Sequence, residues 1–165
     1  MALTGRDGST PFSRIQNVLQ SAPLYEGRFV ERDTTRDTWA TVTEENAALV
    51  VAIADAVNRH DLDALMPYLD GDIEHRDSRL PTVRRGREAI RQYFLELWTE
   101  SPDASFSVDE VVAGGDWVIV RQTWRGLAGG DLVTWVARQF LNRKVRRIDV
   151  CATRAEALEA AGLDE

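Results

Sequence analysis

The spacing of apolar residues changes in the middle of this chain, and that change restricts the fold more than any other feature of the sequence. Between residues 44 and 100 most apolar side chains recur every three or four positions, as on one face of a helix. Between residues 105 and 152 they alternate with polar side chains, which is typical of strands with one buried face. Helices followed by consecutive strands predict an α+β fold.

Start and stop signals predict the first two helices. Thr41 followed three residues later by Glu44 is a capping box, and the apolar face behind it continues to Val57. Asp61 is the expected N-cap of a second, shorter helix, which ends in a turn at residues 70–72.

The remaining elements are two helices and a set of strands. Gly86 precedes a third helix that ends before Pro102, and the helix-forming segment 155–161 is closed by Gly162. A short strand is expected at residues 73–77, ahead of the third helix. Four later strands, joined by short links, predict an antiparallel meander. These four strands cover residues 105–112, 117–124, 132–141 and 145–152.

Residues 1–42 differ from the rest of the chain. They are rich in glycine, serine, threonine, aspartate and arginine and contain few apolar side chains. Thr10 and Pro11 predict the start of a short amphipathic helix near residues 12–20. We therefore expect an accessory segment, residues 1–42, in front of one domain at residues 43–165.

Charge and composition exclude several kinds of partner. The formal net charge of -7 is opposite to the positive surface that nucleic-acid phosphates require. No apolar run reaches the roughly 18 to 20 residues of a membrane helix, and the N-terminus lacks the features of a signal peptide. Cys151 is the only cysteine, so no internal disulfide forms, and we expect a cytoplasmic protein without nucleic-acid or membrane partners.

A twisted antiparallel sheet and three helices bury both apolar surfaces only if the sheet bends around the helices. The expected result is a cone with one open end and a pocket inside. Strand alternation places His75 and Asp77 on one side of the first strand. The other residues expected to line the pocket are Tyr93, Trp98, Gln122, Trp124, Thr134 and Arg138.

Four segments together resemble one superfamily, the nuclear-transport-factor-two-like or SnoaL-like proteins, over residues 44–163. The segments are NRHDLDAL from Asn58, DIEHRD from Asp72, RGREAI from Arg85 and GDWV from Gly115. The ending TRAEALEAAGL, from Thr153, resembles a bacterial subgroup without assigned activity. The resemblance implies a cone-shaped α+β barrel, often a homodimer through the outer face of the sheet, with a small-molecule pocket.

Within this resemblance, Asp77 occupies the spacing at which ketosteroid isomerases carry their general base. A carboxylate in an apolar cone is expected to have a raised pKa, and His75 would form an acid–base pair with it. The alternatives are an Asp77 that caps or pairs with the loop at residues 84–87, and a His75 that is satisfied by one hydrogen bond at the edge of the core.

The sequence also departs from the named enzymes of this superfamily. Ile53 and Val136 occupy the positions of the tyrosine and the acid that polarise the substrate carbonyl in ketosteroid isomerases. Gln122, Trp124 and Val150 stand where limonene epoxide hydrolases carry their catalytic triad. Neither of these two chemistries is therefore expected.

Arg138 allows two interpretations. If it points inward it needs a carboxylate partner, either Asp77 or an acidic ligand; otherwise it lies at the rim and reaches water. No metal is expected, since His75, Asp77 and Glu74 alternate across the strand, and no cofactor motif occurs.

The sequence leaves three functions open. The first is a small-molecule enzyme or enzyme-like binder, an isomerase, cyclase or hydrolase, with Asp77 as general base on a small apolar or carbonyl-containing metabolite. The second is a non-catalytic ligand-binding or dimerisation domain. The third is an accessory subunit that docks through residues 1–42.

Overall fold

The computed structural model describes residues 38–163, so the expected accessory segment and its short helix lie outside the described residues. The helices are α2 (Thr38–Asn58), α3 (Leu62–Leu65), the 3₁₀ helix η1 (Met66–Tyr68), α4 (Arg87–Glu100) and α5 (Arg154–Ala161). The strands are β1 (Leu69–Asp77), β2 (Val83–Arg85), β3 (Ser105–Gly114), β4 (Trp117–Arg125), β5 (Leu132–Leu141) and β6 (Lys144–Cys151).

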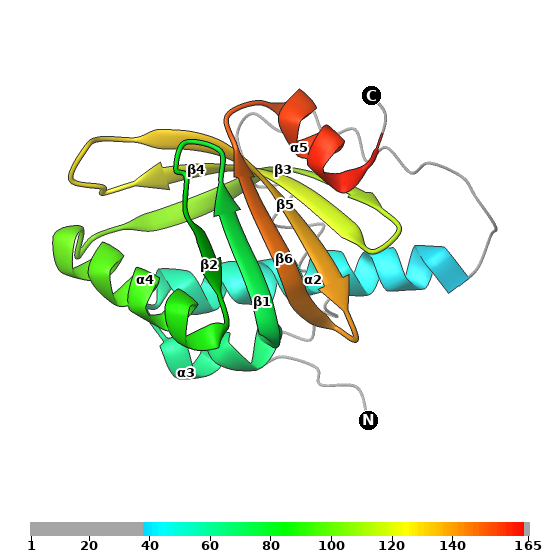
Figure 1. The fold of residues 1–165 in the computed structure, drawn as a ribbon, viewed down its shortest axis with the longest axis horizontal. Helices are drawn as coiled ribbons and strands as arrows, with labels where there is room; N and C mark the ends of the chain where they lie inside the picture. Colours follow the sequence, from blue (N-terminus) through cyan, green and yellow to red (C-terminus); the bar gives the residue numbers. More distant parts are fainter. Residues whose placement is uncertain (1–37, 164–165) are drawn as a thin grey trace, which may run out of the picture.

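The strands form one sheet in the order β2-β1-β6-β5-β4-β3 (Figure 1). Strands β3 to β6 pair antiparallel with their neighbours in sequence, which confirms the meander. β1 joins the far side of β6 in parallel, and the short β2 pairs antiparallel with β1. Register shifts interrupt three of these pairings, and such irregularities bend a sheet.

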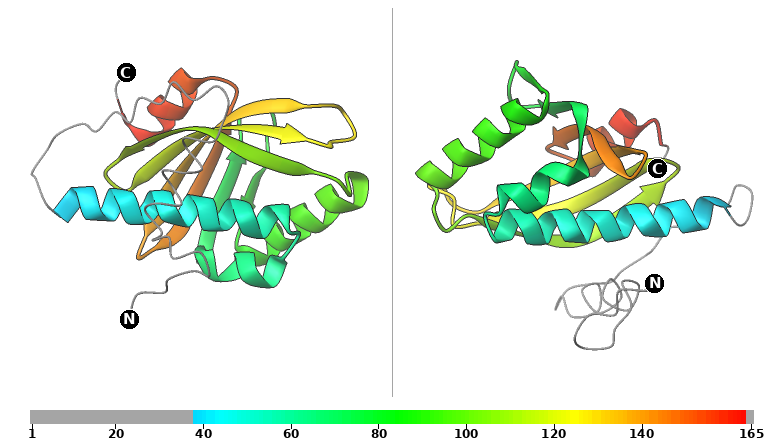
Figure 2. Two further views of the ribbon diagram at one scale, coloured as in Figure 1. Left: turned by 180° about the vertical axis from the view of Figure 1, so that it is seen from behind. Right: turned by 90° about the horizontal axis from the view of Figure 1, so that it is seen from below.

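The curved sheet holds two separate apolar clusters, one on each face. The larger lies on the concave face, between the sheet and helices α2, α3 and α4, and includes Ile73, Val120 and Val136. The smaller lies on the convex face under α5 and includes Ile119 and Leu158. Figure 2 shows α2 across one face of the sheet and α5 on the other. The α+β cone expected from the sequence is thus the observed architecture.

The last helix, α5, ends where its glycine predicts. Gly162 adopts a left-handed conformation after α5, and its N–H donates to the carbonyl of Glu159. The N–H of Leu163 donates to the carbonyl of Leu158, which completes a glycine-terminated cap. α5 packs against part of the convex face. The homodimer expected through the outer face of the sheet stays a prediction.

Three local expectations were wrong. α2 already includes Thr38, so Thr41 lies within the helix and does not cap it. The helix after Asp61 ends at Leu65, and residues 70–72 belong to β1 instead of a turn. β2 was not expected at all. For residues 70–72 and β2, pairing with distant parts of the chain decided the outcome over local propensity. None of the described helices is long and apolar enough to cross a membrane.

Candidate functional site

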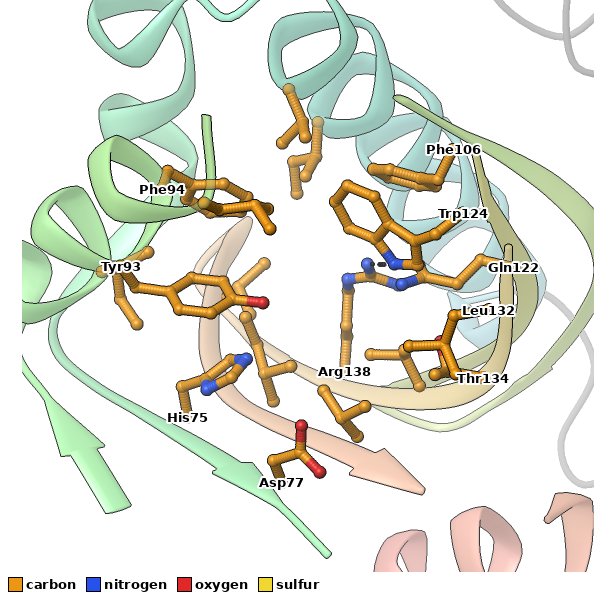
Figure 3. A pocket seen from close by; sticks show the side chains of 18 of the residues that line it. His75, Asp77, Tyr93, Phe94, Phe106, Gln122, Trp124, Leu132, Thr134 and Arg138 are labelled. Carbon is orange, nitrogen blue, oxygen red and sulfur yellow. Dashed lines mark hydrogen bonds between the residues drawn. The ribbon is translucent and has the colours of Figure 1, made fainter. Parts of the chain in front are cut away.

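A cavity of about 280 Å³ lies between the concave face of the sheet and helices α2 and α4 (Figure 3). Most of the side chains that line it are apolar or aromatic, among them Phe94, Phe106, Trp124 and Val136. The polar lining residues are His75, Asp77, Arg79, Tyr93, Gln122, Thr134 and Arg138.

The period-two alternation of the strands aims these polar groups inward. On β4 and β5, Gln122 lies opposite Thr134, and Val118 lies opposite Arg138. Residues directly opposite on antiparallel strands project from the same face, so all four point into the cone. The structure therefore brings together seven of the eight sequence-expected site residues around one cavity; the exception is Trp98.

Trp98 does not line the cavity, although its ring contacts that of Phe94, which does. Its ring stacks on His60 with the centroids 4.4 Å apart, and it lines a separate surface groove. Tyr93, five residues earlier on the helix, does line the cavity. Five residues of an α-helix rotate the side chain by about 140°, so the two aromatic rings do not share one wall.

Asp77 is held by Arg79 in a two-pronged ion pair. The Nε of Arg79 donates to Oδ1 at 2.9 Å and its Nη2 donates to Oδ2 at 2.7 Å, while the Arg79 backbone N–H also donates to Oδ1 at 3.0 Å. These bonds hold the pKa of Asp77 below its ordinary value, although burial acts in the opposite direction. The expected raised pKa is thus wrong, and the partner is neither Arg138 nor the loop at residues 84–87.

His75 is buried, with only 6% of its surface exposed, and remains neutral near pH 7. Burial and, second, the charge of Arg84 lower the pKa of His75 to about 4. Arg84 Nη1 lies 3.4 Å from His75 Nδ1, and the His75 ring lies 5.2 Å from that of Tyr93. Since arginine is a donor, His75 Nδ1 accepts and the ring proton sits on Nε2.

Arg138 is buried inside the cone and does not lie at the rim. It is 6% exposed, and its Nη2 donates to Gln122 Oε1 at 3.2 Å. Its Nη1 is buried without a hydrogen-bond partner. Burial lowers the pKa of Arg138 to about 10, which leaves the group protonated at neutral pH. Figure 3 shows its side chain extending into the space between Tyr93 and Trp124.

Sequence reasoning did not name several of the lining residues, and two of them, Arg79 and Phe106, matter most for the site. Arg79 follows Asp77 by two positions, a spacing at which an aspartate often accepts bonds from its own turn, so this signal was available. Phe106 lies opposite Trp124 across the β3–β4 pair, with ring centroids 4.8 Å apart, and only the strand register reveals that contact. Among the described residues no group of three or more potential metal ligands occurs.

Similar structures share this architecture. A proposed ketosteroid isomerase from Kribbella flavida has a TM-score of 0.61 and 20% identity, covering 66% of this chain and 78% of its own. A proposed polyketide cyclase from Sinorhizobium meliloti has a TM-score of 0.57 and 19% identity, covering 62% and 92%. Bal32a, from a soil-derived mobile gene cassette, has a TM-score of 0.61 and 22% identity, covering 72% and 97%.

The search of curated proteins returned no match. At these identities the solved structures establish the fold and not an activity. The SnoaL-like domain model matches residues 50–148, which is more than half of the chain and includes most of the cavity. The chain therefore belongs to the SnoaL-like domain family.

Proposed function

We propose that this protein binds a small, largely apolar organic molecule in the cavity of its cone. The observation that carries the proposal is the cavity itself, which combines apolar walls with a few convergent polar groups, as small-molecule sites do. The names of two structural neighbours, a proposed ketosteroid isomerase and a proposed polyketide cyclase, support a pocket protein of this kind.

The size of the cavity limits the ligand. A volume of 280 Å³ corresponds to roughly nine water molecules at their liquid volume. This volume lies just below the range of ordinary ligand sites, which begins at about 300 Å³. Phe106 and Trp124 form one aromatic wall, and Phe94 with Tyr93 forms another. A single substituted ring is therefore a better fit than a fused multi-ring compound.

Filling the cavity tests this proposal. Val136 lines the cavity and is 1% exposed, whereas Val133, on the same strand but the opposite face, is 43% exposed. Val136→Phe should abolish binding of the neutral probe cyclohexanone, and Val133→Phe should preserve it. Titration calorimetry measures both affinities, and equal affinities would contradict the proposal.

A second measurement needs no variant. Methyl NMR of the wild-type protein should show cyclohexanone-dependent shifts at Val136 and none at Val133, since only the former contacts the cavity. Shifts confined to Val133, or no saturable shift at all, would mean that the cavity is not a binding site for such molecules.

Acid–base catalysis is the second candidate function, and the placement of Asp77 and His75 favours it. Both line the cavity; Asp77 is ionised and able to accept a proton, whereas His75 is a neutral imidazole near pH 7 whose Nε2–H is able to donate a hydrogen bond. The ion pair with Arg79 makes Asp77 a weaker base than an isolated buried carboxylate.

Deuterium exchange next to the carbonyl of cyclohexanone distinguishes catalysis from binding alone. A catalytic site should accelerate the exchange in D₂O, and Asp77→Asn should remove the acceleration. Glu110→Gln, which alters a carboxylate on β3 outside the cavity, should leave the rate unchanged. Binding without faster exchange would favour the non-catalytic alternative.

A further inference from the structure

Arg138 is a buried cation for which the described residues provide no counter-charge. Among residues 44–163, whose side chains the structure describes, the only hydrogen-bond partner of its side chain is the neutral amide of Gln122. The carboxylate of Asp77 lines the same cavity but pairs with Arg79. Burial lowers the pKa of Arg138, and no acidic group among the described residues opposes this effect.

A buried arginine without a counter-charge destabilises the fold unless a bound ligand supplies the missing negative charge. A buried charge without a counter-ion destabilises a fold, and buried donors without acceptors are rare in native proteins. In the described part of the chain four buried side-chain atoms lack a hydrogen-bond partner, and two of them, Arg138 Nη1 and Thr134 Oγ1, belong to the cavity lining. Thr134 lies directly opposite Gln122, which accepts from Arg138. The unsatisfied groups therefore project from the same part of the β4–β5 wall.

We propose that the ligand of this cavity is a small organic monoanion, a carboxylate whose oxygens accept hydrogen bonds from Arg138. This inference rests on the proposed small-molecule function and adds the chemical class of the ligand. The planar guanidinium group matches a carboxylate in shape and charge. Gln122 uses one hydrogen of Nη2, which leaves the second hydrogen and both hydrogens of Nη1 for the ligand.

The charges of the cavity favour a monoanion over a dianion. Arg138 contributes one positive charge, whereas Asp77 and Arg79 offset each other at the end of β1. A phosphate group with about two negative charges would exceed this balance. A neutral carbonyl would satisfy a hydrogen bond but would leave the charge unpaired.

Two probes with the same ring distinguish the effect of ligand charge from the effect of ligand shape. Cyclohexanecarboxylate and cyclohexanecarboxamide differ mainly in charge, and titration calorimetry at pH 7 measures the affinity of the full-length protein for each. Because hydrogen bonds to a charged group are stronger than neutral ones, the carboxylate should bind about 10- to 100-fold more tightly. Equal affinity for both probes would overturn the inference.

Variants identify the group responsible. Arg138→Met keeps an unbranched apolar stem but removes the guanidinium group and its charge, and it should reduce the preference for the carboxylate to less than threefold. Arg125→Met, at an exposed arginine on β4, should retain the full preference. A preference that survives in Arg138→Met would also overturn the inference, and the wild-type comparison stands even if this variant does not fold.

Failure of the inference differs from failure of the proposed function. If cyclohexanone shifts the Val136 methyl signals but the carboxylate binds no better than the amide, the pocket function stands and the anion is excluded. If no probe perturbs those signals, the small-molecule function itself fails.

Discussion

Replacing Arg138 by methionine should make the ligand-free protein more stable, although the same change should remove anion binding. The reason is the burial of the guanidinium group without a counter-charge. Functional sites often carry such a conflict between stability and binding. A purely structural arginine would give the opposite result, because its loss would remove favourable contacts.

The magnitude follows from the pKa of Arg138. A pKa of about 10, against an ordinary arginine value of at least about 12.5, disfavours the protonated folded state by about 3 kcal/mol. Arginine is protonated in both folded and unfolded chains at pH 7, so this penalty is fully present there and decreases only as the pH rises through about 10.

Loss of the hydrogen bond to Gln122 offsets part of the gain. A buried amide left without its partner costs about 1 to 3 kcal/mol. Arg138→Met alone should therefore stabilise the protein by about 1 kcal/mol. The double variant Arg138→Met/Gln122→Leu removes both polar groups and should gain about 3 kcal/mol, within the range known for replaced buried charges.

Urea denaturation at pH 7 without ligand measures these differences. Arg125→Met, an exposed control on β4, should change the free energy of unfolding by less than about 0.5 kcal/mol. If the free energy of unfolding fell by about 1 kcal/mol or more in both the single and the double variant, Arg138 would have a stabilising counter-charge in the folded protein. The reasoning from an unpaired cation would then be refuted.

Three further predictions concern other parts of the site and its supporting loop. His75 should titrate near pH 4, so the folded state should lose up to about 3 kcal/mol as the pH falls from 6.5 to 4; NMR titration measures its pKa, and a value above 6 would contradict the burial argument. Arg79→Met should raise the pKa of Asp77, which carboxyl NMR detects, and an unchanged value would mean that the ion pair is not its main cause. Gly126→Ala should lower the free energy of unfolding by about 2 kcal/mol or more, since the φ of Gly126 is +73° and an added Cβ would meet the backbone of Asp103. Gly129→Ala, which has open space around it, should be nearly neutral, and thermal melts of both variants measure the difference.

Local sequence signals were sufficient where an element depends on its own residues. The segment before Pro102 forms α4, and Gly162 ends α5, because helix period and capping are properties of neighbouring residues. The alternation of β4 and β5 likewise indicated that Gln122, Thr134 and Arg138 share one face, since a strand turns successive side chains to opposite sides.

Long-range contacts decided the elements that the sequence did not reveal. β2 has only three residues and mostly exposed side chains, so its strand character comes from pairing with β1. The parallel contact of β1 with β6 joins residues that are more than 70 positions apart, and no local pattern encodes it. These two pairings form the wall that carries His75 and Asp77.

The protonation states of the site depend on contacts that form only in the folded chain. The sequence placed Asp77 and His75 on one face of a strand and left open whether Arg138 points inward, but a pKa depends on burial and on charges close in space. Because Arg79 folds back onto Asp77, that carboxylate is a weaker base than expected. Because no acid in the described part of the chain pairs with Arg138, the cone retains an unpaired positive charge, which only the three-dimensional arrangement of the site reveals.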